Sequence, residues 1–201
     1  MSRKGCGGAD RIGVTRVRVR GAAFPGIVKL VRPLCIGGLL AILAAVLIYP
    51  GAVWAEGLPV PNGPVILTIS GEIAVTNADG QAEFDREMLE ALPQTAVRTL
   101  TPWTDDRVVF EGVLMRDLLA LVGSRGETVR ATALNDYAVS IPVSDFEEET
   151  VILAIKMNGK YMPIREKGPL WIIYPLCDDL TDLDTHAKMI WQLRWIDVRR
   201  Q

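Results

Sequence analysis

The chain has 201 residues, with 22 Lys and Arg against 24 Asp and Glu and a formal net charge of −2 at pH 7. This length suggests one domain, or one domain with an extension. The charges are unevenly placed: residues 56–201 hold 14 basic and 23 acidic side chains, a net charge of −9. An acidic domain disfavours nucleic acid as a partner, because binding to phosphates needs clustered cations.

Residues 1–55 contain the parts of an export signal. They carry eight Lys or Arg and one acid, followed by an apolar run over 34–48 and a Pro-Gly pair. Val53 and Ala55 are compact residues at the −3 and −1 positions of a cleavage site, so we predict cleavage after Ala55 and a periplasmic or secreted protein. The domain would then meet the membrane only during export. The alternative is an uncleaved membrane anchor, since the uncharged window is just long enough to span a bilayer.

The signal has no adjacent pair of arginines near its apolar run. A twin-arginine signal is therefore not indicated. We expect export through the general secretory route, which passes an unfolded chain.

The domain that follows opens with strand-like segments and one short helix. Residues 65–70 are β-branched and apolar, and 73–75 could continue this strand past a bend. Asp85 can cap a helix that carries Met88, Leu89 and Leu92 and is broken by Pro93. Further strands are expected over 95–101 and 107–110.

The clearest helix is predicted over 114–122, where Leu114, Leu118, Leu121 and Val122 form one face. Gly123 follows at the position of a left-handed C-terminal cap.

The second half of the domain is predicted to be mostly strand. Asn158-Gly159 is a strong hairpin signal, and residues 170–174 are apolar throughout, which is typical of a strand buried on both faces. The last predicted strand alternates without giving a purely apolar face. The expected strands are 128–133, 137–141, 151–157, 160–164, 170–174 and 191–198. Strands dominate and a few short helices lie between them, so we predict a single α+β domain, mostly β, over 56–201.

Several kinds of active site are disfavoured by composition. His186 is the only histidine, so a multi-histidine metal site is excluded, and beside Asp184 we interpret it as a surface residue. Cys177 is the only cysteine after residue 55, so no internal disulfide can form. It is interpreted as a small half-buried residue, with a metal-ligating thiolate as the alternative.

Four acids lie close together in one predicted loop: Asp178, Asp179, Asp182 and Asp184. We interpret this loop as solvated. Calcium is the alternative, although the spacing is not that of an EF-hand.

Two loops are candidates for binding a ligand. One is Asn135, Asp136 and Tyr137, polar and aromatic at a strand junction. The other contains Arg165, Lys167 and Gly168 and leads directly into the buried strand. Backbone N–H groups and positive charge at a strand entrance can bind an anion, although an ordinary charged loop has the same appearance.

The order of motifs resembles a known family. The segments FEGV at 110–113, MRDLL at 115–119, ALNDYAVSIP at 133–142 and GPLWIIYP at 168–175 occur in a succession similar to that of the oxidoreductase molybdopterin-binding domain family. This resemblance implies the sulfite-oxidase-type fold, a mixed α+β domain rich in strands. It also implies a molybdopterin cofactor, in which a pterin dithiolene holds molybdenum and a protein cysteine completes the sulfur ligation.

By this resemblance the cysteine would fall within residues 99–103, where the chain has Thr99 and Trp103 but no cysteine. A hydroxyl is a far poorer ligand for a soft metal than a thiolate. A molybdenum enzyme would also be loaded with cofactor before export, which a general secretory signal does not permit.

Two functions remain open. The first is a derivative of the fold that binds another small ligand, or a protein partner such as a membrane sensor or redox protein. The second is a molybdopterin-dependent periplasmic oxidoreductase. In both, the candidate ligand-binding residues are Thr99, Trp103, Asn135, Asp136, Tyr137, Arg165, Lys167 and Gly168.

Overall fold

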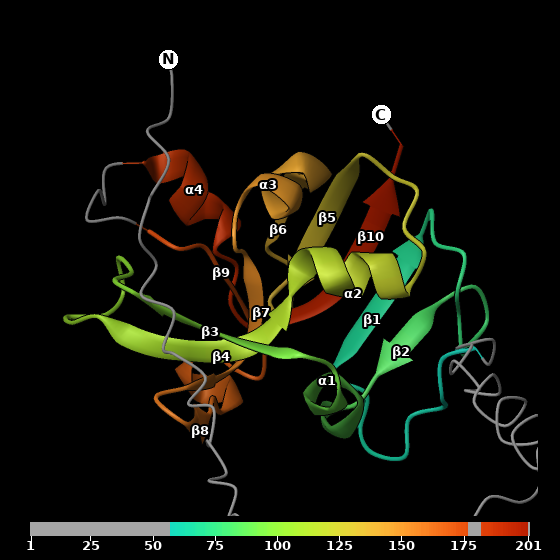
Figure 1. Ribbon diagram of the computed structural model, residues 1–201, viewed down its shortest axis with the longest axis horizontal. Coiled ribbons are helices and arrows are strands. Elements are labelled where there is room, and N and C mark those ends of the chain that lie inside the picture. Colours follow the sequence, from blue (N-terminus) through green and yellow to red (C-terminus); the bar gives the residue numbers. More distant parts are fainter. Residues whose placement is uncertain (1–56, 177–181, 201) are drawn as a thin grey trace, which may run out of the picture. The chain divides into compact units, whose positions relative to one another are not determined.

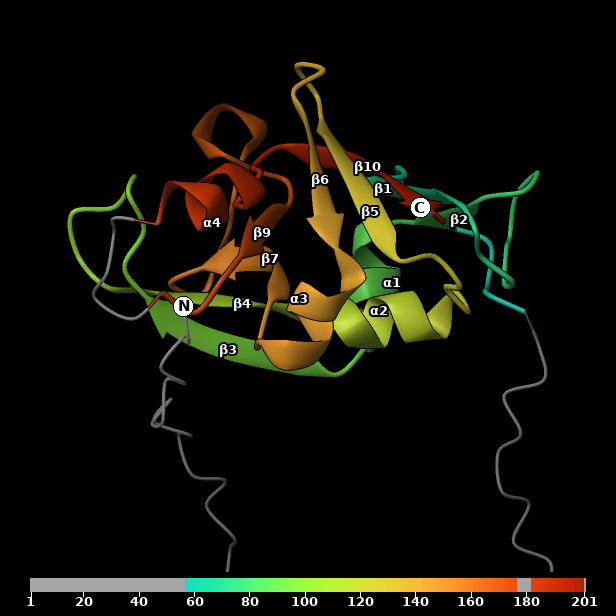
Figure 2. The same cartoon turned by 90° about the horizontal axis from the view of Figure 1, so that it is seen from above.

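A computed structural model describes residues 57–176 and 182–200 of the chain. The predicted signal, Cys177 and the acids Asp178 and Asp179 lie outside the described residues. The described part is α+β and mostly β, as predicted, with two sheets and short helices (Figures 1 and 2). Within these residues no helix is long and apolar enough to cross a membrane.

The first sheet has the strand order β2-β1-β10-β5-β6. Its strands are β1 (Leu67–Gly71), β2 (Ala82–Phe84), β5 (Thr128–Ala133), β6 (Ala138–Pro142) and β10 (Leu193–Arg199). β1 and β10 are parallel, whereas the other neighbours are antiparallel. The earliest and latest strands of the domain therefore lie side by side inside one sheet.

The second sheet has the order β3-β4-β7-β8, and β9 also pairs with β7. Its strands are β3 (Gln94–Thr99), β4 (Val108–Leu114), β7 (Ile152–Met157), β8 (Lys160–Tyr161) and β9 (Trp171–Ile173). The register between β4 and β7 shifts at Gly112. A Cβ atom on Gly112 would lie only 1.9 Å from the carbonyl oxygen of Leu153, so only glycine permits this close approach.

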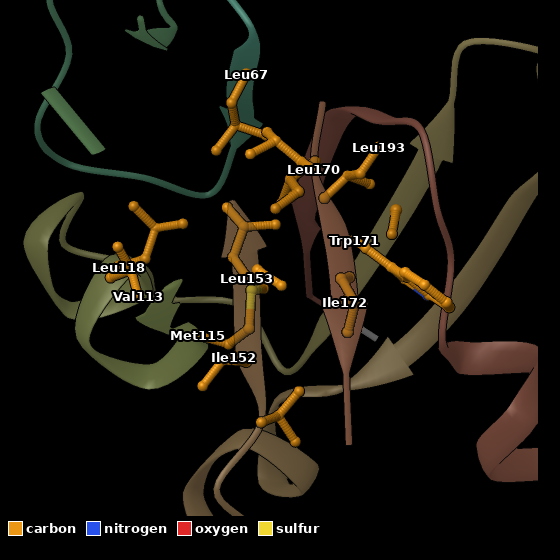
Figure 3. Packing of buried hydrophobic residues seen from close by; sticks show 14 of the residues in the cluster. Leu67, Val113, Met115, Leu118, Ile152, Leu153, Leu170, Trp171, Ile172 and Leu193 are labelled. Carbon is orange, nitrogen blue, oxygen red and sulfur yellow. The ribbon is translucent and has the colours of Figure 1, made fainter. Parts of the chain in front are cut away.

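The two sheets and α2 share one hydrophobic core (Figure 3). Leu67 and Leu193 come from the first sheet, Leu153 and Ile172 from the second, and Leu118 from α2; all five are fully buried. Burial of β9 on both faces confirms the interpretation of the apolar 170–174 segment.

The helices are short. They are α1 (Arg86–Ala91), α2 (Met115–Leu121), α3 (Val143–Glu148) and α4 (Leu183–Lys188), with a 3-10 helix over Ile164–Glu166. Asp85 caps α1 as predicted, since its side chain accepts a hydrogen bond from the amide of Met88 (2.9 Å). It also accepts from the amides of Asn62 and Gly63, both at 2.8 Å. The hydrogen bond from Met88, then that from Gly63, lowers the pKa of Asp85 below its usual value.

Some predicted elements were wrong or incomplete. Residues 73–75 do not extend β1, because the amides of Ala74 and Val75 bond to the carbonyl oxygen of Val122 at the end of α2. The predicted strand over 160–164 ends at Tyr161, where the chain turns into the 3-10 helix. β2 and α3 were not predicted.

The acidic loop was also predicted wrongly where it is described. Asp182 and Asp184 belong to the start of α4, where the Asp182 side chain accepts from the amides of Asp184 and Thr185, both at 3.2 Å. Asp182 therefore serves as a helix cap rather than as a solvated loop residue.

The last strand differs from its predicted alternation because of a bulge. The register between β10 and β5 shifts between Leu193 and Trp195. This extra residue places Leu193 on the same buried side as Ile196 and Val198, while Trp195 is 42% exposed. The bulge explains why neither face of the plain alternation is purely apolar.

Candidate functional site

A cavity of about 310 Å³ lies where the β5–β6 hairpin, α4 and the loop carrying Trp103 meet. This volume is at the lower end of the range for small-molecule sites, about 300–1,000 Å³. The lining is mainly aromatic and apolar: Trp103, Ala133, Asn135, Tyr137, His186, Ala187, Met189, Ile190 and Trp191.

Tryptophan rings form the inner part of this site. Trp103 contacts Trp191 edge to face, with ring centroids 4.7 Å apart and an interplanar angle of 80°. Trp171, which is fully buried, lies behind both rings at 5.9 and 6.1 Å. Edge-to-face contacts add stabilisation to that gained from burying the apolar surface of the rings. The tryptophans therefore form a well-packed wall of the cavity.

Backbone hydrogen bonds fix the segment 189–192 that carries much of the lining. The indole N–H of Trp171 donates to the carbonyl oxygen of Met189 (3.0 Å), and the amide of Ile172 donates to the carbonyl oxygen of Ile190 (3.0 Å). β9 thus positions this segment from the core side. On the other side, the amide of Leu134 donates to the carbonyl oxygen of Gln192 (2.9 Å).

The tip of the β5–β6 hairpin projects from the sheet (Figure 2) and supplies the polar side of the cavity. Asp136 has a positive φ of 64°, and the Asn135 side-chain oxygen accepts from the amide of Tyr137 (3.2 Å). This tight turn directs Tyr137 towards α4, where its hydroxyl donates to the carbonyl oxygen of Ala187 at 3.4 Å. Tyr137 remains 49% exposed.

His186 belongs to α4 and is half-buried, more enclosed than the surface position predicted for it. Its ring lies 6.3 Å from Trp103 at an angle of 64°. The side chain lines the cavity, and its Nε2 atom is buried without a hydrogen-bond partner in the described part of the chain. The sequence offered little signal for this, because α4 itself was not predicted.

α4 is held in place by a small polar cluster outside the cavity. The ammonium group of Lys188 forms an ion pair with Asp145 in α3 at 2.7 Å, and the Tyr174 hydroxyl donates to the same carboxylate at 3.1 Å. Both charged side chains are largely buried. The positive charge of Lys188 is thereby balanced by the Asp145 carboxylate.

The structure brings together three of the eight candidate residues. Trp103, Asn135 and Tyr137 line the cavity, and Asp136 completes the turn between the last two. Trp191, Met189 and Ile190 also line it, although no local sequence signal indicates them as site residues. The alternation of residues 191–198 predicts only a strand at Trp191.

The other four candidates lie outside the cavity lining. Thr99 is fully buried at the end of β3, and its hydroxyl bonds to the backbone of Leu176. Arg165 is 85% exposed and pairs only weakly with the neighbouring Glu166 at 3.5 Å. Lys167 lies 5.6 Å from the centre of the Trp171 ring, and Gly168 is buried in the turn that follows.

The lining does not match the chemistry of a molybdenum-bearing pterin. Such a group needs a thiolate for the metal and cations for its phosphate. None of the described residues that line the cavity is Cys, Lys or Arg. No group of three or more His, Cys, Asp or Glu that could hold a metal occurs within residues 57–176 and 182–200.

Comparisons with known proteins agree on the kind of domain. Residues 80–178 match the model of the family described as the oxidoreductase molybdopterin binding domain. Twenty-nine chains of solved structures match. One is the sulfane dehydrogenase SoxCD from Paracoccus pantotrophus, with a TM-score of 0.51, 19% identity and a match over 67% of this chain. That match spans 38% of the SoxCD chain, and at this identity it shows the fold alone. No curated protein matches.

Proposed function

We propose that this domain is a metal-free derivative of its family which binds a small molecule in the cavity beside Trp103. The family is that of the oxidoreductase molybdopterin binding domain, with the sulfite-oxidase-type fold. The observation that carries this proposal is the lining itself. It is aromatic and apolar, and its described residues include neither a thiol nor a lysine or arginine. Function is assigned here from the site rather than from the fold, which can host several activities.

The position implied for the metal ligand supports the same conclusion. Thr99 stands at the end of β3, and its hydroxyl is engaged with the backbone of Leu176 at 3.0 and 3.2 Å. It is therefore a structural group. The hydroxyl of Thr101, two residues on, lies 3.1 Å from that of Thr104.

The family match favours a second function, a molybdopterin-dependent oxidoreductase. Analysis of the protein purified from its native compartment separates the two. We expect no stoichiometric molybdenum and no extractable pterin, but a small organic molecule detected by native mass spectrometry. Stoichiometric molybdenum with pterin would overturn the metal-free proposal.

We also propose that the domain works outside the cytoplasm after cleavage behind Ala55. The basic, apolar and small-residue segments of 1–55 support this. N-terminal sequencing of the protein from its native compartment should start at Glu56. A protein that keeps residues 1–55 and stays with the membrane fraction would instead be anchored.

A further inference from the structure

The aromatic walls of the cavity meet at steep angles. Trp191 stands at 80° and His186 at 64° to the ring of Trp103, with centroid distances of 4.7 and 6.3 Å. Tyr137 lines the same cavity from the hairpin. None of the ring pairs measured around Trp103 is parallel, so they offer no slot in which a flat ring would stack on two faces. Walls of this kind suit a rounded group.

The electrostatic setting favours a cation over an anion or a neutral group. Aromatic faces carry negative potential and attract cations. No Lys, Arg, Asp or Glu occurs among the described residues of the lining. Lys188, between the lining residues Ala187 and Met189 in the chain, is paired with Asp145 at 2.7 Å. The domain from residue 56 has a net charge of −9, from 14 basic and 23 acidic residues, which also attracts cations.

The hydrogen-bonding groups of the cavity further narrow the kind of cation. A primary ammonium has three N–H donors and needs several acceptors. In the lining, the Asn135 oxygen already accepts from the Tyr137 amide, and the carbonyl oxygens of Ala187 and Met189 accept from Tyr137 and Trp171. The Nε2 atom of His186 has no partner in the described part of the chain and can offer one acceptor, fewer than the three N–H donors of a primary ammonium require. A trimethylammonium group has no N–H donor and leaves none unsatisfied.

We propose that the cavity binds a small organic cation with a trimethylammonium head, of the size of choline. This inference rests on the proposed function, because it names the ligand class of the same site. The head group would lie against Trp103, Trp191 and Tyr137, with the rest of the molecule directed past the hairpin tip to solvent.

The decisive experiment compares choline with 3,3-dimethylbutan-1-ol, which has the same shape without the charge. Binding to the full mature domain is measured by calorimetry and by tryptophan fluorescence. We expect choline to bind at least about tenfold more tightly than the neutral alcohol. Equal binding of the two would overturn the cation inference and leave the small-molecule cavity of the proposed function intact.

Variants locate the binding. Tyr137→Leu should weaken choline binding severalfold, since it removes one half-exposed ring from the cavity without disturbing the core. Tyr161→Leu is the matched control, because Tyr161 lies outside the cavity lining and is 45% exposed, close to the 49% of Tyr137. A loss in both variants, or in neither, would overturn the assignment to this cavity.

Trp103→Leu is a second variant, and thermal unfolding establishes whether it folds. A folded Trp103→Leu protein that binds choline as well as the wild type would contradict the inference. Absence of any choline binding to the wild-type protein would overturn it too. A different result would contradict the proposed function itself, namely stoichiometric molybdenum and pterin in the purified protein.

Discussion

The hydroxyl of Thr99 is paired with the backbone of Leu176: it accepts from the Leu176 amide at 3.0 Å, and its single proton is shared between the carbonyl oxygens of Leu100 at 3.1 Å and Leu176 at 3.2 Å. This contact joins the end of β3 to the segment after β9. A cysteine at position 99 would be a weaker partner for both groups. The side chain thus contributes to the fold at a place where the family resemblance implies a metal ligand.

Thr99→Val should lower the free energy of unfolding by about 0.5–1.5 kcal/mol, because the shape is kept while the Leu176 amide retains only its contact with the carbonyl oxygen of Tyr174 (2.9 Å). Denaturant unfolding at neutral pH measures the change. Thr99→Ser keeps the hydroxyl and should lower the free energy of unfolding clearly less than Thr99→Val does. If valine were as stable as threonine, the hydroxyl would have no structural role.

Gly112→Ala should be strongly destabilising, by at least about 3 kcal/mol, since the new methyl group must push apart two paired central strands. Its Cβ atom would lie 1.9 Å from the Leu153 oxygen. The control is Gly159→Ala in the hairpin turn, where no atom lies within 4 Å and only the positive φ of 74° is unfavourable. We expect about 1–2 kcal/mol there. Equal costs for the two variants would contradict the close packing at the bulge.

Asp85 should make the stability of the fold depend on pH in the acidic range. Its pKa in the folded protein is lowered, chiefly by the hydrogen bonds from the amides of Met88 and Gly63. The carboxylate therefore stabilises the fold at pH values above the usual aspartate pKa of about 3.9, and this contribution is lost as the pH falls through the lower folded value.

Asp85→Asn isolates that charge, since asparagine can still cap α1. The wild type should melt at a higher temperature than the variant at pH 6–7, and the difference should shrink below about pH 4. Thermal unfolding across pH checks this. A difference that is constant from pH 7 to pH 3 would show that the charge has no such effect.

Glu90 should titrate differently when Tyr161 loses its hydroxyl. The Tyr161 hydroxyl donates to Glu90 at 2.7 Å, and Lys156 forms an ion pair with the same carboxylate at 2.9 Å. These contacts, the tyrosine first, lower the pKa of Glu90. Tyr161→Phe should raise that pKa in an NMR titration of the side-chain carboxyl, whereas Tyr137→Phe should leave it unchanged. No rise in Tyr161→Phe would mean that Lys156 alone sets the value.

Most of the fold could be predicted from local sequence signals. The cap at Asp85, the helix before Gly123 and the Asn158-Gly159 hairpin depend on neighbours in the chain. The bulge in β10 could not be predicted, because an extra residue in a strand is set by its pairing with β5. The short α4 was missed because its acidic start gives the same pattern as a solvated loop.

The candidate site was only partly predictable for a related reason. Asn135 and Tyr137 were recognised because polar and aromatic residues at a strand junction are a local signal. His186 and Trp191 join them only through tertiary packing, about 50 residues further along the chain. Arg165 had the right chemistry for an anion site, but the fold leaves it 85% exposed beside Glu166.

The parallel pairing of β1 with β10 bears on when this domain can fold. β10 stands between β1 and β5, so the first sheet lacks an inner strand until residues 193–199 have been synthesised. A nascent chain that stops short of them leaves the edges of both neighbours unpaired. The first sheet therefore cannot close until residues 193–199 have left the ribosome, however early the strands on either side of β10 are made.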